Sequence, residues 1–179
     1  MKILITGAAG YIGTKLVEKL NSSNVELSCV DNLMFNQKSL SLFNTNNVKF
    51  IKGDVRDLSL MNKLYKQADV IIPLAAIVGA PLSAKMPKDT EEINFGAIDQ
   101  MCKNLSKDQR VIMPVTNSGY GIGKKDEMCD ENSPLNPISD YGQTKVRAEK
   151  VIMERENSIS FRLATVFGTS ERMRVDLLV

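Results

Sequence analysis

The sequence predicts a parallel, doubly wound α/β fold, and three observations support this prediction. Short apolar segments alternate with segments of helical periodicity along almost the whole chain. Several apolar segments are hydrophobic without interruption, such as VII at 70–72 and VIMPV at 111–115, which suits strands covered on both faces. A chain of 179 residues, 43% of them hydrophobic, is long enough to build one such domain.

The N-terminal segment contains a complete strand–helix–strand unit. The apolar KILIT at 2–6 forms a strand, glycines follow it, and apolar residues then recur at helical spacing over 11–20. The polar NSSN at 21–24 ends this helix, and VELSCV at 25–30 forms the next strand. The same order repeats, with strands expected at 48–52, 70–72, 111–115 and 159–163 and helices at 58–66, 90–105 and 141–156.

One long segment, 120–140, interrupts this alternation. It contains Gly121, Gly123, Pro134 and Pro137, residues that favour turns over regular structure. Loops of this length within a compact domain are usually functional or mobile.

The composition excludes several classes of protein. Histidine is absent, which removes Ser-His-Asp and Cys-His nucleophiles and imidazole metal ligands. Cys29, Cys102 and Cys129 are odd in number and far apart, so we expect neither a metal site nor a disulfide framework, and a reducing cytoplasm fits best. Lys and Arg number 23 against 21 Asp and Glu, a balance that gives no electrostatic case for nucleic acid or an anionic membrane. No apolar run approaches the roughly 20 residues of a membrane span, so we expect a soluble, cytoplasmic protein.

A glycine-rich turn with an acidic partner predicts a dinucleotide site. Gly7, Gly10 and Gly13 lie between the first strand and the first helix, where glycine lets backbone amides approach a pyrophosphate. Asp31 ends the second strand 18 residues after Gly13, close to the spacing expected of a carboxylate that binds the adenosine ribose. Such a carboxylate also repels a 2′-phosphate, which favours NAD over NADP, although Asn32 beside it is compatible with either nucleotide. The alternative is a plain strand-to-helix turn followed by an acidic turn residue.

Tyr141 and Lys145 form a candidate catalytic pair. They are four residues apart on a predicted helix, so their side chains project from one face. A neighbouring ammonium favours the phenolate form of a tyrosine, which is otherwise a poor base at neutral pH. Thr116 stands at the end of the fifth strand, where its hydroxyl can bind the same substrate oxygen or, alternatively, its own backbone.

Taken in order along nearly the whole chain, these motifs resemble the extended short-chain dehydrogenases/reductases, and within them the NAD-dependent nucleotide-sugar epimerases and dehydratases. The resemblance rests also on Gly53-Asp54-Val55, Leu74-Ala75-Ala76, Asn94 and the segment 162–168. It implies a Rossmann-type sheet with helices on both faces, and NAD as the cofactor. It also implies the catalytic set Thr116, Tyr141 and Lys145.

The resemblance assigns further positions to the cofactor and the substrate. Gly7, Gly10, Tyr11 and Ile12 would surround the pyrophosphate, and Asp31 and Asn32 would bind the adenosine ribose. Asp54 and Val55 would lie at the adenine, and Leu74, Ala75 and Ala76 near the nicotinamide ribose. Lys145 and Tyr141 would lie beside that ribose, and Asn94 behind the active site. Ser118 and Thr165 would face the nucleotide sugar.

Departures from the family pattern bear on both the reaction and the substrate. Family dehydratases usually carry acidic residues directly after the catalytic threonine, whereas this chain has Asn117 and Ser118. We therefore expect epimerisation, by hydride abstraction and return at a sugar carbon such as C4, in preference to dehydration or one-way reduction. Thr165 and Pro73 replace a common asparagine and a common histidine, so the sugar and its nucleotide stay undefined.

The resemblance also implies a division of the chain. Residues 1–168 would form the NAD-binding domain, and 169–179 would begin a substrate-binding region that is largely absent. A non-catalytic NAD-binding module is therefore the alternative to an enzyme. The family's habit implies a homodimer through the helices at 90–105 and 141–156, to which Ile93, Met101, Val151 and Ile152 would contribute apolar contacts.

Overall fold

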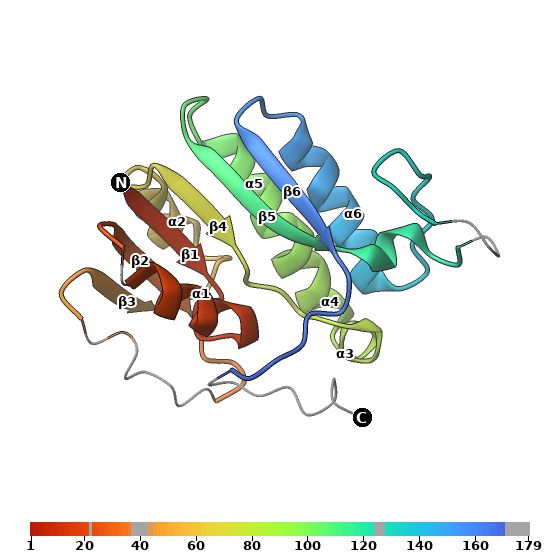
Figure 1. Ribbon diagram of the computed structural model, residues 1–179, viewed down its shortest axis with the longest axis horizontal. Coiled ribbons are helices and arrows are strands. Elements are labelled where there is room, and N and C mark those ends of the chain that lie inside the picture. Colours follow the sequence, from red (N-terminus) through yellow and green to blue (C-terminus); the bar gives the residue numbers. More distant parts are fainter. Residues whose placement is uncertain (22, 37–42, 44, 124–127, 171–179) are drawn as a thin grey trace.

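The fold is a six-stranded, fully parallel sheet, as the sequence predicts (Figure 1). The computed structural model describes residues 1–21, 23–36, 43, 45–123 and 128–170. The strand order is β3-β2-β1-β4-β5-β6, so the chain winds outward from the central β1 first in one direction and then in the other. The strands are β1 (Lys2–Thr6), β2 (Glu26–Asp31), β3 (Val48–Lys52), β4 (Val70–Pro73), β5 (Arg110–Thr116) and β6 (Ser158–Leu163).

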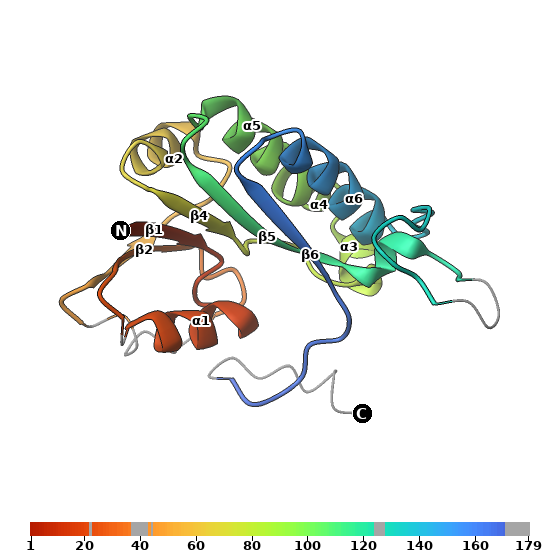
Figure 2. The same ribbon diagram turned by 45° about the horizontal axis from the view of Figure 1, so that its top comes forward.

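Helices cover both faces of this sheet (Figures 1 and 2). Helix α1 (Tyr11–Asn21) lies on one face, and α2 (Leu58–Tyr65), α5 (Ala97–Asn104) and α6 (Asp140–Met153) lie on the other. Each face has its own core. Met61, Met101 and Ile152 pack beneath the three-helix layer, and Val17, Ile5 and Cys29 pack beneath α1.

The helix predicted at 90–105 is more complex than expected. Two short helices, α3 (Ala80–Lys85) and α4 (Pro87–Thr90), precede it, and a turn of π-helix, η2 (Glu91–Gly96), joins α4 to α5. Pro81 and Pro87 stand in the first turns of α3 and α4, where a missing N–H costs little. Six-residue and four-residue helices are too short to show the apolar periodicity on which the sequence prediction depended.

The helix predicted at 141–156 begins one residue earlier and ends at Met153. Its N-cap is Ser139, whose hydroxyl accepts a hydrogen bond from the Gly142 amide at 3.1 Å. Before it, β5 runs into a short 3-10 turn, η3 (Asn117–Tyr120). The described parts of the following loop, 121–123 and 128–139, contain no helix or strand, as predicted.

The residues proposed for a dimer contact are mostly unsuitable for it. Ile93, Met101 and Ile152 are only 4%, 2% and 0% exposed, because they fill the core beneath the helices. Of the four, only Val151 is partly accessible. Their helical spacing reflects burial within one chain, so the prediction that these three residues contact a second copy is wrong.

The sheet is not covered evenly. The β6 residues Ile159 and Phe161, on the face that carries α1, are 44% and 49% exposed. Helix α1 does not cover them, because it packs over β1 and β2, away from the β6 edge of the sheet (Figure 2). On the opposite face, the β6 residues Ser160 and Arg162 contact α6. An apolar sheet face at β6 is therefore open to solvent in the described part of the chain.

Two glycines let the β1–α1 turn pack tightly against the sheet. Gly7 has φ +67°, and a Cβ there would lie 2.6 Å from the backbone nitrogen of Ala75. A Cβ on Gly13 would collide with the Gly7 carbonyl oxygen and lie 2.6 Å from the Ala8 carbonyl oxygen. The first turn of α1 therefore passes directly over the backbone that precedes it.

Gly13→Ala is expected to lower the free energy of unfolding by about 2 kcal/mol, because the added methyl group meets backbone atoms that have no room to move. Urea unfolding followed by circular dichroism measures the change. Gly123→Ala is the matched control, since a Cβ there has nothing within 4 Å. Equal unfolding midpoints for the two variants would contradict the packing described.

Candidate functional site

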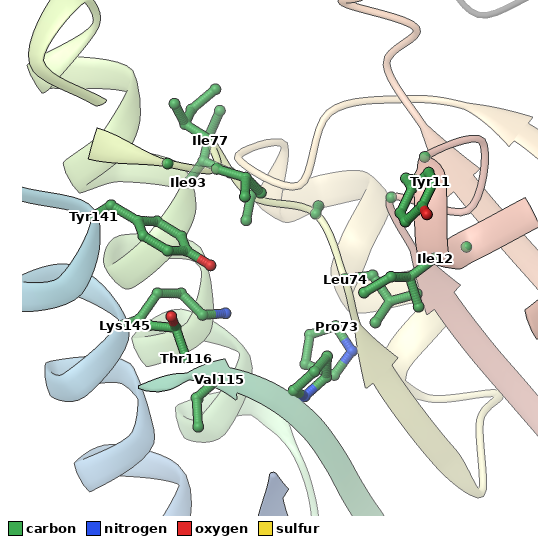
Figure 3. Close-up of a pocket in the computed structure, with 18 of the residues that line it drawn as sticks. Tyr11, Ile12, Pro73, Leu74, Ile77, Ile93, Val115, Thr116, Tyr141 and Lys145 are labelled. Carbon is green, nitrogen blue, oxygen red and sulfur yellow. The ribbon is translucent and has the colours of Figure 1, made fainter. Parts of the chain in front are cut away.

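A cavity of about 440 Å³ opens at the carboxyl ends of the strands (Figure 3). Ligands of open parallel sheets bind at this edge, where the strand order reverses. Its walls come from the β1–α1 turn, the ends of β2, β4 and β5, the start of α6 and the chain after β6. The predicted site residues that line it are Gly7, Gly10, Tyr11, Ile12, Asp31, Asn32, Val55, Leu74, Ala75, Ala76, Thr116, Ser118, Tyr141, Lys145 and Thr165.

The β1–α1 turn forms one wall of the cavity. Tyr11 and Ile12 begin α1, and the amides of a first helical turn have no partner within the helix. The partial positive charge of a helix N-terminus adds to these donors, so the turn is suited to an anion such as a pyrophosphate. Gly10 closes the turn by donating its backbone N–H to the Gly7 carbonyl at 3.0 Å.

Asp31 ties the end of β2 to this turn. Its Oδ2 accepts a hydrogen bond from the Ala9 amide at 3.0 Å, and its Oδ1 accepts one from the Leu33 amide at 2.8 Å. These two bonds fix the orientation of the carboxylate at the cavity wall. Met34 and Phe35, which follow at the cavity wall, were not predicted as site residues; their place directly after Asp31 and Asn32 was the available signal.

Asp54 is placed differently from its predicted neighbours. Both of its oxygens bind Arg56, with Nε 2.9 Å from Oδ1 and a terminal guanidinium nitrogen 2.8 Å from Oδ2. Oδ1 also accepts the Arg56 amide and Oδ2 accepts the Asn32 side chain, so all four positions are occupied. The Arg56 guanidinium holds the pKa of Asp54 well below its usual range. Asp54 therefore faces Arg56 and Asn32, and only Val55 and Gly53 of this segment line the cavity.

Arg56 also joins this segment to the helical layer. A terminal guanidinium nitrogen donates to Asp89 of α4 at 2.7 Å and to Glu92 of η2 at 3.0 Å. All the members of this network are partly exposed, so it orients the segment more than it stabilises the fold.

Asn94 lies behind the cavity and holds the loop after β4 in place. Its side chain accepts from the Ile77 amide at 2.8 Å and donates to the Ile77 carbonyl at 2.9 Å. It also donates to the Thr144 hydroxyl of α6 at 3.4 Å. The π-helical turn that carries Asn94 thus links two walls of the cavity, and such turns are frequent at functional sites.

Thr116, Tyr141 and Lys145 meet at the opposite wall. Figure 3 shows the Tyr141 hydroxyl and the Lys145 amine side by side, with Thr116 next to them at the end of β5. Thr116 Oγ1 accepts from the Ser118 amide at 3.1 Å, so the hydroxyl caps η3 and still has its proton to donate. Lys145 is 5% exposed. Burial lowers its pKa to about 8, and the carboxylate of Glu149 opposes this effect.

The chain after β6 closes one side of the cavity. Leu163, Ala164 and Val166 line it together with Thr165. Beyond them the Tyr11 hydroxyl donates to the Gly168 carbonyl at 2.6 Å, and the hydroxyls of Ser170 and Thr14 are 2.8 Å apart. Apart from Thr165, these contacts were not predicted, because they join residues more than 150 positions apart. Residues 171–179, in the segment expected to begin a substrate region, lie outside the described residues.

The arrangement is that of a doubly wound α/β domain with a glycine-rich turn and a Tyr–Lys pair at one cavity. The family model described as "NAD dependent epimerase/dehydratase family" matches residues 3–176, and the chain belongs to this family. It is thus one of the extended short-chain dehydrogenases/reductases, as the motifs indicated.

The chain is similar to several proteins of known name. It is 30% identical to a UDP-glucose 4-epimerase of Lactobacillus helveticus over 156 residues. It is 32% identical over 123 residues to a UDP-N-acetyl-alpha-D-glucosaminuronate decarboxylase of Bacillus cytotoxicus. Among solved structures, a UDP-glucuronic acid 4-epimerase of Bacillus cereus in complex with UDP-glucuronic acid and NAD superposes with a TM-score of 0.79 at 28% identity, covering 90% of this chain and 56% of that one.

The chain spans about half the length of the curated relatives that it matches. The Lactobacillus helveticus match covers 85% of this chain and 46% of that protein, and the Bacillus cytotoxicus match covers 68% and 38%. Within the described ranges no helix is long and apolar enough to cross a membrane.

Asn94→Ala is expected to lower the free energy of unfolding by about 3 kcal/mol, because the buried N–H and C=O of Ile77 lose their partners. Urea unfolding gives the magnitude, and hydrogen exchange at the Ile77 amide reports the local opening. Asn104→Ala is the control, since that exposed side chain donates only to the Gln100 carbonyl of its own helix. An Ile77 amide as protected as in the unmodified protein would disprove the role of Asn94.

Proposed function

We propose that the cavity binds NAD and that the protein, with a nucleotide sugar as substrate, is an epimerase. The observation that carries the proposal is one cavity with the N-terminus of α1 on one wall and the Tyr141–Lys145 pair on the other. The family to which the chain belongs, and the relatives named after UDP-sugar reactions, support the same conclusion.

The residues that line the cavity are compatible with NAD. The backbone of the β1–α1 turn would hold the pyrophosphate, and Asp31 and Asn32 would bind the adenosine ribose. The apolar side chains of Met34, Phe35 and Val55 would enclose the adenine in place of the Asp54 carboxylate, which is saturated by Arg56 and Asn32. Among the described residues that line the cavity, Asp31 is the only one with a carboxylate. Its negative charge would repel the 2′-phosphate of NADP.

Bound NAD+ would supply a hydride acceptor, and the protein would supply the proton transfer. Tyr141 would remove the proton from a sugar hydroxyl, expected to be that at C4, as the hydride leaves the same carbon. Lys145 favours the phenolate form of Tyr141 and can donate to the nicotinamide ribose. The Thr116 hydroxyl would donate a hydrogen bond to the same substrate oxygen, and Ser118 and Thr165 would contact the sugar nucleotide. With the same proton returned by Tyr141 when the carbon is reduced again at its opposite face, the centre would be inverted and the pair of residues would end the cycle unchanged.

The cavity wall favours epimerisation over elimination of water. Dehydration needs a further acid–base group near the reacting carbons, and the positions after Thr116 are Asn117 and Ser118. Asp31, the only carboxylate among the described lining residues, belongs to the wall of the β1–α1 turn. Oxidation and re-reduction at one carbon need no such group.

The experiment is to incubate the protein with NAD+ and UDP-hexoses and to follow sugar configuration by proton NMR. Formation of the C4 epimer supports the proposal. A product lighter by about 18 Da would indicate dehydration instead. In a parallel incubation supplied with NADH in place of NAD+, net consumption of NADH would indicate a reductase.

A non-catalytic NAD-binding module is the second candidate. The open apolar face at Ile159 and Phe161 favours it, because exposed apolar surface is suited to contact with another element or protein. NAD binding without any conversion of sugar would support this alternative.

The organisation of the whole protein is also a proposal. Residues 1–168 would be the NAD-binding domain and 169–179 the start of a substrate-binding region. A homodimer through the outer faces of α5 and α6, in the cytoplasm, is the assembly that we propose, and analytical ultracentrifugation tests it.

Tyr141→Phe is expected to reduce epimerisation at least about a hundredfold while leaving NAD affinity within a few-fold, because only the acid–base group is lost. The NMR assay and calorimetric titration with NAD+ measure the two effects. Tyr65→Phe is the control, since Tyr65 is buried in the core beneath α2. Near-normal turnover by Tyr141→Phe would show that another group is the base.

Asp31→Asn is expected to weaken NAD binding by about 2 kcal/mol and to reduce discrimination against NADP. The physical reason is the loss of both a charged acceptor for the ribose and a charge that repels a 2′-phosphate. Calorimetric titration with each nucleotide measures the ratio. Asp99→Asn, on α5 and paired with Lys103, should leave both affinities unchanged. An unaltered ratio in Asp31→Asn would contradict the assignment.

A further inference from the structure

Glu149 is a buried carboxylate that the proposed reaction does not use. It lies one helical turn after Lys145 on α6, so the two side chains project from the same face. Glu149 is 6% exposed and Lys145 is 5% exposed. Burying two ionisable groups costs free energy unless each finds compensation, so this pair needs a physical explanation.

Strand β6 fixes the Glu149 carboxylate. Arg162 Nε lies 3.0 Å from both of its oxygens, and the Ser160 hydroxyl donates to Oε1 at 2.6 Å. Arg162 is held in turn, because a terminal nitrogen of its guanidinium donates to the Tyr120 hydroxyl at 3.2 Å and to the Glu131 carbonyl at 3.0 Å. The carboxylate is therefore held in place at the inner face of α6.

Two opposing influences act on the pKa of Lys145. Burial lowers the pKa of Lys145 to about 8, and the negative charge of Glu149 raises it against this effect. A pKa only slightly above neutral means that a further decrease would leave the Lys145 amine largely uncharged at neutral pH. An uncharged amine no longer favours the phenolate form of a neighbouring tyrosine.

From this geometry we infer that Glu149 is a positioning residue of the Tyr141–Lys145 pair, and that its carboxylate, fixed by Arg162, keeps the Lys145 amine charged inside the cavity wall. The inference rests on the proposed function, since it assumes that the charge of Lys145 serves the reaction. Beyond that function, the charge of Lys145 would depend on Glu149, a residue that does not itself line the cavity.

The other charged groups around α6 do not replace Glu149. Arg162 of β6, which bonds Glu149 and the Tyr120 hydroxyl, is a cation. Asp89 of α4 and Glu92 of η2, on elements packed against α6, are paired with Arg56. Thr116 of β5 is neutral. Glu91 of η2 is paired with Arg147, at 2.8 Å, on the exposed side of the helix. Removal of Glu149 would also leave the positive charge of Arg162 without its partner. A nearby uncompensated cation lowers the pKa of a lysine, as the loss of the Glu149 charge itself does.

The test is an NMR titration of Lys145 in the ¹³C-labelled protein without substrate, so it is independent of any epimerase activity. The lysine ε-methylene signal is assigned by its loss in Lys145→Arg. Glu149→Gln is expected to lower the titration midpoint of Lys145 by about one pH unit or more. Glu149→Asp keeps the negative charge, so its Lys145 midpoint should lie close to that of the unmodified protein. Glu154→Gln, an exposed carboxylate at the end of the same helix, should leave it unchanged.

A second variant separates this role from a purely structural salt bridge. Glu149→Gln combined with Arg162→Met removes both charges, so neither is left buried and unpaired. If the pair only stabilises the fold, the double variant titrates at the wild-type midpoint. The inference requires a lowered midpoint there too, and a wild-type midpoint in either folded variant would overturn it. Because no sugar or turnover is involved, this result stands whether or not the protein proves to be an epimerase.

Discussion

The close approach of the β1–α1 turn to the end of β4 is the contact on which the site depends. Gly7 passes so near Ala75 that no side chain fits between them. This contact places the N-terminus of α1 at the carboxyl edge of a parallel sheet, where the strand ends converge. The order β3-β2-β1-β4-β5-β6 then brings Asp31 to one flank of that turn and Thr116 to the other. A bulkier turn would remove the wall against which a dinucleotide would lie.

Around this contact, buried polar groups keep the cavity walls in place. Asp31 binds the backbone of the glycine-rich turn, and Asn94 binds the backbone of the loop after β4. Arg162 and Glu149 fix the inner face of α6. In each case a side chain satisfies groups that would otherwise be buried without partners, so the same bonds that stabilise the fold also orient the residues facing the cavity.

The sequence predicted the fold and much of the cavity wall because that information is local. Apolar periodicity located the six strands, and the glycine spacing, Asp31 and the Tyr141–Lys145 pair each lie within a short segment. What the sequence missed depends on contacts between distant segments. Arg56 redirects Asp54 away from the cavity, Tyr11 binds Gly168, and packing beneath the helices buries Ile93 and Met101. None of these contacts follows from the spacing of residues along the chain, because each depends on which distant segments pack together in the folded protein.

The central claim is that hydride leaves and returns at one sugar carbon within a single cavity. It is tested most directly with a UDP-hexose carrying deuterium at C4, incubated with the protein and NAD+ in ordinary water. The account predicts a C4 epimer that retains its deuterium, because the same hydride is returned to the opposite face. Loss of the label to solvent would contradict this account, because it would show that C4 is inverted through proton abstraction. The absence of any epimer would show that this chain by itself does not perform the reaction.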